Sequence, residues 1–485
     1  MTRRELIRDA GIGFAGLTAA GGLGGLAGKL ISGSPAAAQS PLAPRWVTRP
    51  DLQIPGLTVL RNEPGASRDP IFMAPYNAPD AQAGAVIVDS SGEPLWENPV
   101  ADRVTTNFKV QRYRGEPVLV WWQGEIELGH GVGEYVIADS SYRPIRRIQA
   151  GNGRRGDLHE FVITPRDTAL LTSYEVTRAN LRSVGGSPNG TIQDALFQEI
   201  DLHSGRVLME WHSLDHAGLR ESYAPLTPDW DYFHINSVDL DHDGNLLISS
   251  RSTHTIYKIA RDGEIIWRLG GGRSDFAMGQ GASFAWQHHA RRLPDGTLSV
   301  FDNGATPAVE PLSRGIVLAL DETAMQAELI HQYTRRGILS GSQGSVQELP
   351  SGNVFIGWGE VPRVSEFSRD GRLLFDALLA AKHESYRAFR MPWQGKPASS
   401  PSIAVQIPGR SEATVYASWN GATEVRAWRL LSGSAPDSLR PERTVRMAGF
   451  ETALPVGRAG PHVAVEALDA RGVSLGRSAS APVPA

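Results

Sequence analysis

A pattern of four short strands repeats along the chain, and this repeat limits the fold more than any other feature. In each unit an alternating strand leads into a polar turn, and a second apolar strand follows. The turns align at Gly115, Gly244, Gly296, Gly352 and the pair Asp167-Thr168. The second half of each unit ends on an aromatic residue, at Trp96, Trp211, Trp267, Tyr333 and Phe375. Four strands per unit at intervals of about 40–60 residues are typical of a β-propeller, in which ring closure buries both faces of each sheet.

Five units are clear, and the strands expected around Val59 and Ile71–Pro75 would complete a sixth. The sequence therefore predicts an all-β fold with a six-bladed propeller over residues 45–395. Beyond Pro397 the repeat stops, although short alternating strands continue. The stretch Ser418-Trp419-Asn420-Gly421 and the later Trp428 favour a small immunoglobulin- or fibronectin-like sandwich over residues 397–485. A packing or spacer module is the simplest interpretation of that part.

The first 39 residues have the layout of an export signal. Arg3 and Arg4 precede a short apolar pair, a Gly- and Ala-rich stretch follows, and small residues stand near Ala36–Ser40. This layout indicates a twin-arginine signal peptide, removed on export to the periplasm or the outside. A retained anchor is the alternative. Nothing later in the chain is apolar for long enough to span a membrane.

Composition excludes several classes of function. The chain has no cysteine, which excludes disulfides, thiolate nucleophiles and cysteine-ligated zinc. Its net charge is −4 with no strongly basic stretch after the leader, which argues against nucleic acid as a partner.

Propeller geometry predicts which residues meet. The first strand of each blade lines the channel, so its start and the end of the second strand lie at one mouth. Counting back from each turn gives the first of these levels, at Asn107, His159, Asn236, His288 and Gly344. His234 and His289 lie within two residues of the same level. Counting forward gives the second level: Trp122, Tyr174, Arg251 and Asn303, with Trp358 beside it. Arg314 falls in a loop expected at the same mouth.

Each of these residues also has a purely structural interpretation. A histidine at the start of a strand is usually packed or capping, as we expect for His130 and His254. Histidines that follow the repeat register are better candidates for a shared site. For Arg251 and Arg314 the alternative is a salt bridge between blades, and for Trp122, Tyr174 and Trp358 it is core packing.

The candidate residues suit the transfer of an anionic group between aromatic alcohols. Imidazole is a nucleophile and proton carrier near neutral pH. Arg and Asn donors can hold the oxygens of a tetrahedral anion, and aromatic side chains can hold a flat ring. The spacing of the histidines and carboxylates disfavours a zinc site, although Asp157-x-His159-Glu160 leaves a metal site as an alternative. We therefore expect no cofactor, with a structural Ca²⁺ in the channel as an open alternative.

The segments "DLHEF", "DYFHINSVDLD", "IIWRLGG", "WQHHAR", "FDNG", "SRG" and "LPSGNVFIGWG" together resemble the arylsulfotransferase family, in the branch shared by bacterial and fungal proteins. The resemblance covers most of residues 45–395. It implies a propeller enzyme that moves a sulfuryl group from a phenolic sulfate ester to another phenol, without a nucleotide donor, through a sulfuryl-carrying histidine. A homodimer is compatible with it.

By position, the resemblance implies that His234 and His288 are active-site histidines and that Arg314 holds the anion. The sequence departs from the family in one blade, where "SGSQGSVQELPSGN" offers no histidine. Either His159, His234 or the His288/His289 pair would then take the nucleophile role, or the chemistry of this branch has changed. A propeller that only binds sulfated or aromatic ligands or glycans is the main alternative function, and a quinone-dependent dehydrogenase is a weaker one, since no haem motif or redox cysteine accompanies it.

Overall fold

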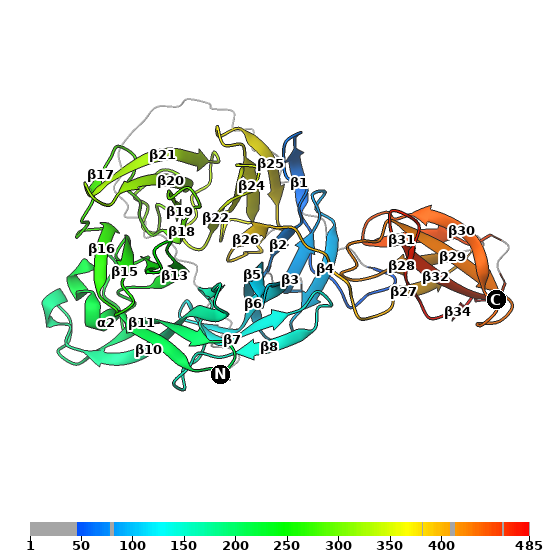
Figure 1. Ribbon diagram of the computed structural model, residues 1–485, viewed down its shortest axis with the longest axis horizontal. Coiled ribbons are helices and arrows are strands. Elements are labelled where there is room, and N and C mark those ends of the chain that lie inside the picture. Colours follow the sequence, from blue (N-terminus) through cyan, green and yellow to red (C-terminus); the bar gives the residue numbers. More distant parts are fainter. Residues whose placement is uncertain (1–45, 78–81, 381, 408–412, 458–459, 485) are drawn as a thin grey trace, which may run out of the picture. The chain divides into compact units, whose positions relative to one another are not determined.

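The computed structural model describes residues 46–77, 82–380, 382–407, 413–457 and 460–484 (Figure 1). Strands and turns make up nearly all of these residues, which confirms the all-β prediction. The predicted signal peptide at residues 1–39 lies outside the described residues.

In the described part of the chain, residues 58–390 form six sheets, each built on four antiparallel strands, and two of them carry one further strand. The first contains β26 (Ala388–Arg390), β2 (Ile71–Met73), β3 (Gly84–Val88) and β4 (Pro94–Pro99). The second contains β5 (Val104–Tyr113), β6 (Glu116–Glu127), β7 (His130–Ala138) and β8 (Pro144–Ile148). The third contains β9 (Phe161–Ile163), β10 (Thr168–Ala179), β11 (Gly190–Asp201) and β12 (Val207–His212).

The remaining three sheets continue in chain order. The fourth contains β13 (Ile235–Leu240), β14 (Leu246–Ser250), β15 (Thr255–Ile259) and β16 (Ile265–Gly270). The fifth contains β18 (His288–Arg292), β19 (Leu298–Asp302), β20 (Arg314–Asp321) and β21 (Gln326–Thr334), with β17 (Ala277–Met278) added in parallel. The sixth contains β22 (Ser345–Glu348), β23 (Val354–Gly357), β24 (Arg363–Phe367) and β25 (Leu373–Leu378).

The first strand of each sheet contacts the first strand of the next. These contacts run from β26 to β5, β9, β13, β18, β22 and back to β26, and Figure 1 shows the labelled members of this set facing one centre. The return contact exists because β26, from the end of this region, pairs with β2 from its beginning. Strand β1 (Thr58–Asn62) pairs with β25 instead of joining the first sheet, so the stretch around Val59 covers an edge rather than completing a unit.

Three of the aromatic residues that end the repeat tie their sheet to the following one. Trp211 Nε1 donates to the Gly263 carbonyl at 3.0 Å, and Trp267 Nε1 donates to Glu322 Oε2 at 3.1 Å. The Tyr333 hydroxyl donates to the Arg369 carbonyl at 3.1 Å. Each acceptor lies in the turn between the last two strands of the next sheet. The same contact between neighbouring sheets therefore explains why an aromatic residue recurs at this position of the repeat. The apolar cores likewise lie between neighbouring sheets, as where Trp267 and Phe276 pack with Ile316.

Residues 402–482 form two further sheets. One contains β27 (Ser402–Gln406), β28 (Thr414–Ser418) and β31 (Glu451–Pro455). The other contains β30 (Arg440–Arg446), β29 (Ala427–Gly433), β32 (His462–Leu468) and β33 (Ser474–Arg477), with β34 (Ala481–Pro482) on β32. Their facing sides share a core that includes Val415, Trp428, Leu454 and Val465.

The helices in the described residues are single turns, η1 (Arg182–Val184), α2 (Ser213–His216) and η2 (Leu219–Glu221). None of the helices among these residues has the length and apolar character needed to cross a membrane.

Candidate functional site

The inner strands are irregular where the candidate residues stand. The pairing registers shift within β5, β13 and β18, between Thr106 and Lys109, Ile235 and Ser237, and His288 and Arg291. Close to these shifts and at the start of β22, four residues that are not glycine have positive φ: Asn107 (55°), His234 (58°), His289 (53°) and Gln343 (65°). Positive φ costs such residues about 1–3 kcal/mol, and bulges redirect side chains. The chain therefore holds a strained backbone at the level from which these side chains leave the strands.

The imidazole of His159 is held by a buried carboxylate. His159 Nδ1 lies 2.7 Å from Asp157 Oδ2. The Asp157 carboxylate also accepts hydrogen bonds from the Gly131 and His159 backbone amides and from Thr172 Oγ1, at 2.6, 3.0 and 2.9 Å. Burial acts to raise the pKa of Asp157, but His159 and these donors outweigh it and hold the pKa well below its usual range. An ionised Asp157 fixes the orientation of the His159 ring through Nδ1 and stabilises positive charge on the ring.

A second carboxylate holds His234 in the same way. Asp231 Oδ2 makes a short hydrogen bond with His234 Nδ1, and it lies 3.3 Å from Nε2 of His130. Burial is the largest influence on His234 and, despite the carboxylate, lowers its pKa to about 4. His234 is therefore a neutral imidazole at pH 7, and its Nε2 carries a lone pair.

The histidines form one cluster with tyrosines. The ring centroids of His159 and His234 are 4.7 Å apart at an interplanar angle of 83°. His130 lies 5.3 Å from His234 and 3.9 Å from the ring of Tyr174. Tyr386 contacts His159 from another side at 5.5 Å. Residues from four of the six sheets, or from the segments that lead into them, thus surround one small volume.

His288 borders this cluster, but both of its ring nitrogens have partners. Its Nδ1 lies 2.7 Å from Asn303 Oδ1, and its Nε2 accepts the Gln343 backbone amide at 3.2 Å. Asn303 is oriented by two carbonyl acceptors, those of Ser340 and Gln343, at 3.0 and 3.1 Å. Burial, together with the charge of Arg251, holds the pKa of His288 well below its usual value. His288 is therefore neutral and firmly oriented.

Arg251 is linked to the histidine cluster through the backbone of His234. Its backbone amide donates to the His234 carbonyl at 2.9 Å, which ties the two residues together. Its guanidinium lies 4.8 Å from the ring centroid of Trp286, and Nη2 donates to the Gly341 carbonyl at 3.0 Å. Burial lowers its pKa, opposed by the charges of Asp231 and Glu360. No carboxylate forms an ion pair with Arg251 among the described residues, so its charge is available for an anion.

The structure does not bring all the sequence candidates to this cluster. Arg314 is occupied by Asp302, Gln332 and the carbonyls of Gly281 and Ser283. His289 instead lines a separate opening of about 280 Å³ with Lys109, Arg291 and Phe389. Asn236 donates to the Gln287 carbonyl at 2.7 Å.

Two of the three candidate aromatic residues are core residues. Trp122 is fully buried, packs on glycines of β7 and donates to the Gly156 carbonyl at 2.9 Å. Trp358 is fully buried and donates to Ser365 Oγ at 2.9 Å. Tyr174 does belong to the cluster, where its hydroxyl donates to the Ile235 carbonyl at 2.6 Å. Core packing, the alternative stated above, therefore describes both tryptophans.

Three members of the cluster were not predicted as site residues, namely His130, Asp231 and Tyr386. The spacings Asp157-x-His159 and Asp231-x-x-His234 carried a signal, because a carboxylate two or three residues before a histidine can reach its Nδ1. His130 carried no such signal, since it begins the third strand of its sheet rather than the first.

Beneath the histidines, one buried carboxylate holds three cations. Glu160 accepts Lys109 Nζ at 3.1 Å and Arg387 Nη1 at 3.0 Å, and it also pairs with Arg291. Burial acts to raise the pKa of Glu160, but the cations hold it well below its usual value. Lys109 and Arg291 of this network also line the opening that contains His289.

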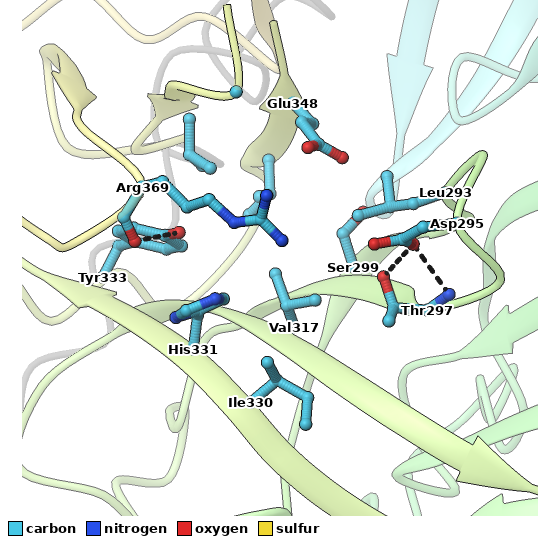
Figure 2. Close-up of a pocket in the computed structure, with 13 residues that line it drawn as sticks. Leu293, Asp295, Thr297, Ser299, Val317, Ile330, His331, Tyr333, Glu348 and Arg369 are labelled. Carbon is cyan, nitrogen blue, oxygen red and sulfur yellow. Dashed lines mark hydrogen bonds between the residues drawn. The ribbon is translucent and has the colours of Figure 1, made fainter.

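Figure 2 shows a different cavity, of about 30 Å³, lined by Val317, Ile330, His331, Tyr333 and Arg369 among others. It has room for about one water molecule, and none of the clustered histidines lines it. The histidine cluster is therefore the better candidate site. Within it, the groups His130–Asp231–His234 and His130–Asp157–His159 each have ligand atoms within 4.8 Å of one another, close enough for one metal ion.

Comparisons with known proteins bear on the family. The sequence model of a family described as Arylsulfotransferase (ASST) matches residues 109–380. No curated protein matches the chain.

Solved structures resemble the chain only weakly. A protein of unknown function from Bacteroides caccae is 12% identical with a TM-score of 0.41, over 66% of this chain and 98% of that one. Virginiamycin B lyase from Staphylococcus aureus, solved with quinupristin, is 10% identical with a TM-score of 0.35, over 75% and 96%. The periplasmic gluconolactonase of Pseudomonas aeruginosa is 14% identical with a TM-score of 0.28, over 78% and 96%. Similarities of this size support no inference about ligand or reaction.

Proposed function

Because the chain belongs to the arylsulfotransferase family, we propose that it moves a sulfuryl group from an aryl sulfate ester to a phenolic acceptor without a nucleotide donor. The observation that carries the proposal is the pair of neighbouring imidazoles, His159 and His234, each held at Nδ1 by a carboxylate. A carboxylate in this position fixes the tautomer and stabilises the imidazolium that forms during the reaction. The two Nε2 atoms are then free for a nucleophile and a proton carrier.

We assign the nucleophile to His234 and the proton transfer to His159. His234 Nε2 attacks the sulfur, the bond from sulfur to the aryl oxygen breaks, and His159 gives a proton to the departing phenolate. In the second half the acceptor phenol returns a proton to His159 and attacks the sulfur, and the N–S bond breaks. The low pKa of His234, about 4, keeps it neutral and nucleophilic at pH 7.

Arg251 is the proposed anion holder. It is linked to His234 through the backbone and has no carboxylate ion pair within the part of the chain that the structure describes, whereas Arg314 is bound to Asp302. A guanidinium that is already desolvated stabilises the charge that develops on the sulfuryl oxygens. Tyr174 and Tyr386 are the aromatic residues of the cluster that can contact the phenolic ring.

The remaining sequence predictions are retained as proposals. The six sheets would be the blades of a six-bladed β-propeller over residues 45–395, and the cyclic contacts of the inner strands support this. Residues 397–485 would be an immunoglobulin- or fibronectin-like module. The leader would direct export through the twin-arginine pathway to the periplasm or the outside.

Mass spectrometry tests the proposed function. The full chain is exposed to 4-nitrophenyl sulfate without an acceptor, and peptides are searched for a sulfuryl adduct. We expect the adduct on His234, released when a phenol is added. His234→Asn should abolish it, while His159→Asn should slow its formation by about 10²–10⁴-fold, the usual range for loss of a general acid. An adduct on His288, or none on any residue together with no transfer, would contradict the proposal.

A further inference from the structure

His130 is a buried histidine that the proposed reaction does not use. It is 5% exposed, its Nδ1 has no hydrogen-bond partner among the described residues, and its Nε2 faces Asp231 Oδ2 at 3.3 Å without hydrogen-bond geometry. Oδ1 of Asp231 is likewise buried and has no partner there. Buried polar atoms without partners are unfavourable and rare, so two of them beside a poorly aligned pair call for an occupant.

The spacing of these atoms suits a metal ion. His130 Nε2 and Asp231 Oδ2 are 3.3 Å apart, and the ligand atoms of His130, Asp231 and His234 lie within 4.8 Å of one another. Zinc bonds of about 2.0–2.2 Å in a tetrahedral site place neighbouring ligand atoms about 3.4 Å apart. Two imidazoles and a carboxylate are ligands that first-row transition metals prefer over Mg²⁺ or Ca²⁺.

The group His130–Asp157–His159, which shares His130, is a poorer metal site. Its carboxylate, Asp157, already accepts four hydrogen bonds, from Gly131, from Thr172 and from the backbone and ring of His159. A metal would have to displace these donors. Asp231 offers an unpaired oxygen, and its side chain is 28% exposed, which gives an ion a way in.

We infer that His130, Asp231 and His234 bind a divalent transition-metal ion of the Zn²⁺ type, and that the bound ion switches off sulfuryl transfer. Coordination through His234 Nδ1, the nitrogen that faces Asp231, displaces the hydrogen bond between them. The remaining proton of the neutral ring is then on Nε2, so the lone pair that would attack sulfur is lost. The inhibition rests on the proposed function; the binding of the ion does not.

Calorimetric titration of the metal-free full chain with ZnCl₂ tests the site. We expect one ion per chain, and at least tenfold weaker binding in His130→Gln and Asp231→Asn. His159→Gln is the matched control, because it removes an imidazole of the same cluster that belongs only to the other group, and its affinity should stay within about threefold. Thermal unfolding with and without zinc gives a second readout, with a rise in Tm in the unchanged protein and none in His130→Gln.

The outcomes separate the two proposals. No zinc binding, or binding lost in His159→Gln and kept in His130→Gln, overturns the metal site. If Asp231→Asn does not fold, the zinc affinity of His130→Gln is the deciding measurement. Zinc should also inhibit transfer by the unchanged protein, and transfer that continues at saturating zinc overturns the switch. If the protein binds zinc at these residues but transfers no sulfuryl group at any zinc concentration, the proposed function fails and the metal site stands.

Discussion

At the scale of single residues, ring nitrogens and their partners decide which histidines can react. His159 and His234 have carboxylates at Nδ1, whereas His288 has neutral partners at both nitrogens. The repeat register in the sequence selected all three. It could not rank them, because the partner atoms come from Asn303 and from the backbone of Gln343, which are distant in sequence from His288.

One buried histidine outside the proposed reaction predicts how stability depends on pH. The ring of His254 is stacked on Tyr223 at 4.2 Å, its Nε2 is unpaired, and burial and the charge of Arg251 lower its pKa to about 4. The unfolded chain takes up this proton near pH 6.5 and the folded protein only near pH 4. The contribution of His254 is thus present above pH 6.5 and lost as the pH falls towards 4.

Replacing His254 with Phe keeps the ring and removes the titration. Between pH 7 and pH 4.5 we expect the free energy of unfolding of His254→Phe to fall by on the order of 2 kcal/mol less than that of the unchanged protein, after allowance for partial solvent screening. Urea unfolding at four pH values measures the difference. Parallel pH profiles for the two proteins would contradict the assignment.

At the scale of elements, the inner strands bring together charges that lie far apart in the sequence. Glu160, which leads into β9, meets Lys109 of β5, Arg291 of β18 and Arg387 next to β26. Because each comes from a different sheet, no local pattern predicts the network. The Glu160 carboxylate offsets the positive charges of these three side chains where the strands converge. Removing one partner of a buried ion pair leaves the remaining charges uncompensated, which destabilises the fold.

The substitution Glu160→Gln tests this network. Three buried cations would lose their shared carboxylate, and we expect a loss of about 3–5 kcal/mol in the free energy of unfolding. Urea unfolding at pH 7 is the measurement. Glu63→Gln is the control, because its pair with Arg61 is exposed on both sides and should contribute less than about 1 kcal/mol. Equal losses in the two variants would show that Glu160 has no special role.

At the scale of the whole molecule, closure depends on strands from the two ends of the sheet region. The family match covers residues 109–380 and so omits β26 and the first sheet's other strands. Without β26 and β2, the inner strands β22 and β5 each lose a neighbour, and apolar side chains that pack against the first sheet, such as Phe108 of β5 and Phe355 of β23, become exposed.

Two shortened chains test the proposed boundaries. Residues 40–395 should show one cooperative thermal transition, at a lower Tm than the full chain because bonds such as Thr48 to Glu451 and Asn420 to Glu97 are lost. Residues 109–380 alone should show no cooperative transition. A cooperative transition in the shorter chain, measured by circular dichroism and calorimetry, would contradict the closure by β26.

The sequence by itself determined the strand repeat, the family and the level of the repeat at which His159, His234 and Arg251 stand, since each follows from periodic patterns or local motifs. Only the tertiary structure decided which of these side chains are already paired with another residue and which remain able to bind a substrate. Arg314 and Arg251 are alike in sequence, but Asp302 pairs with the first, and no carboxylate forms an ion pair with the second among the described residues. His130 enters the cluster solely because Asp231, Tyr174 and His234 from later in the chain fold against it. Reactivity depends on contacts between distant segments, which periodicity along one chain does not encode.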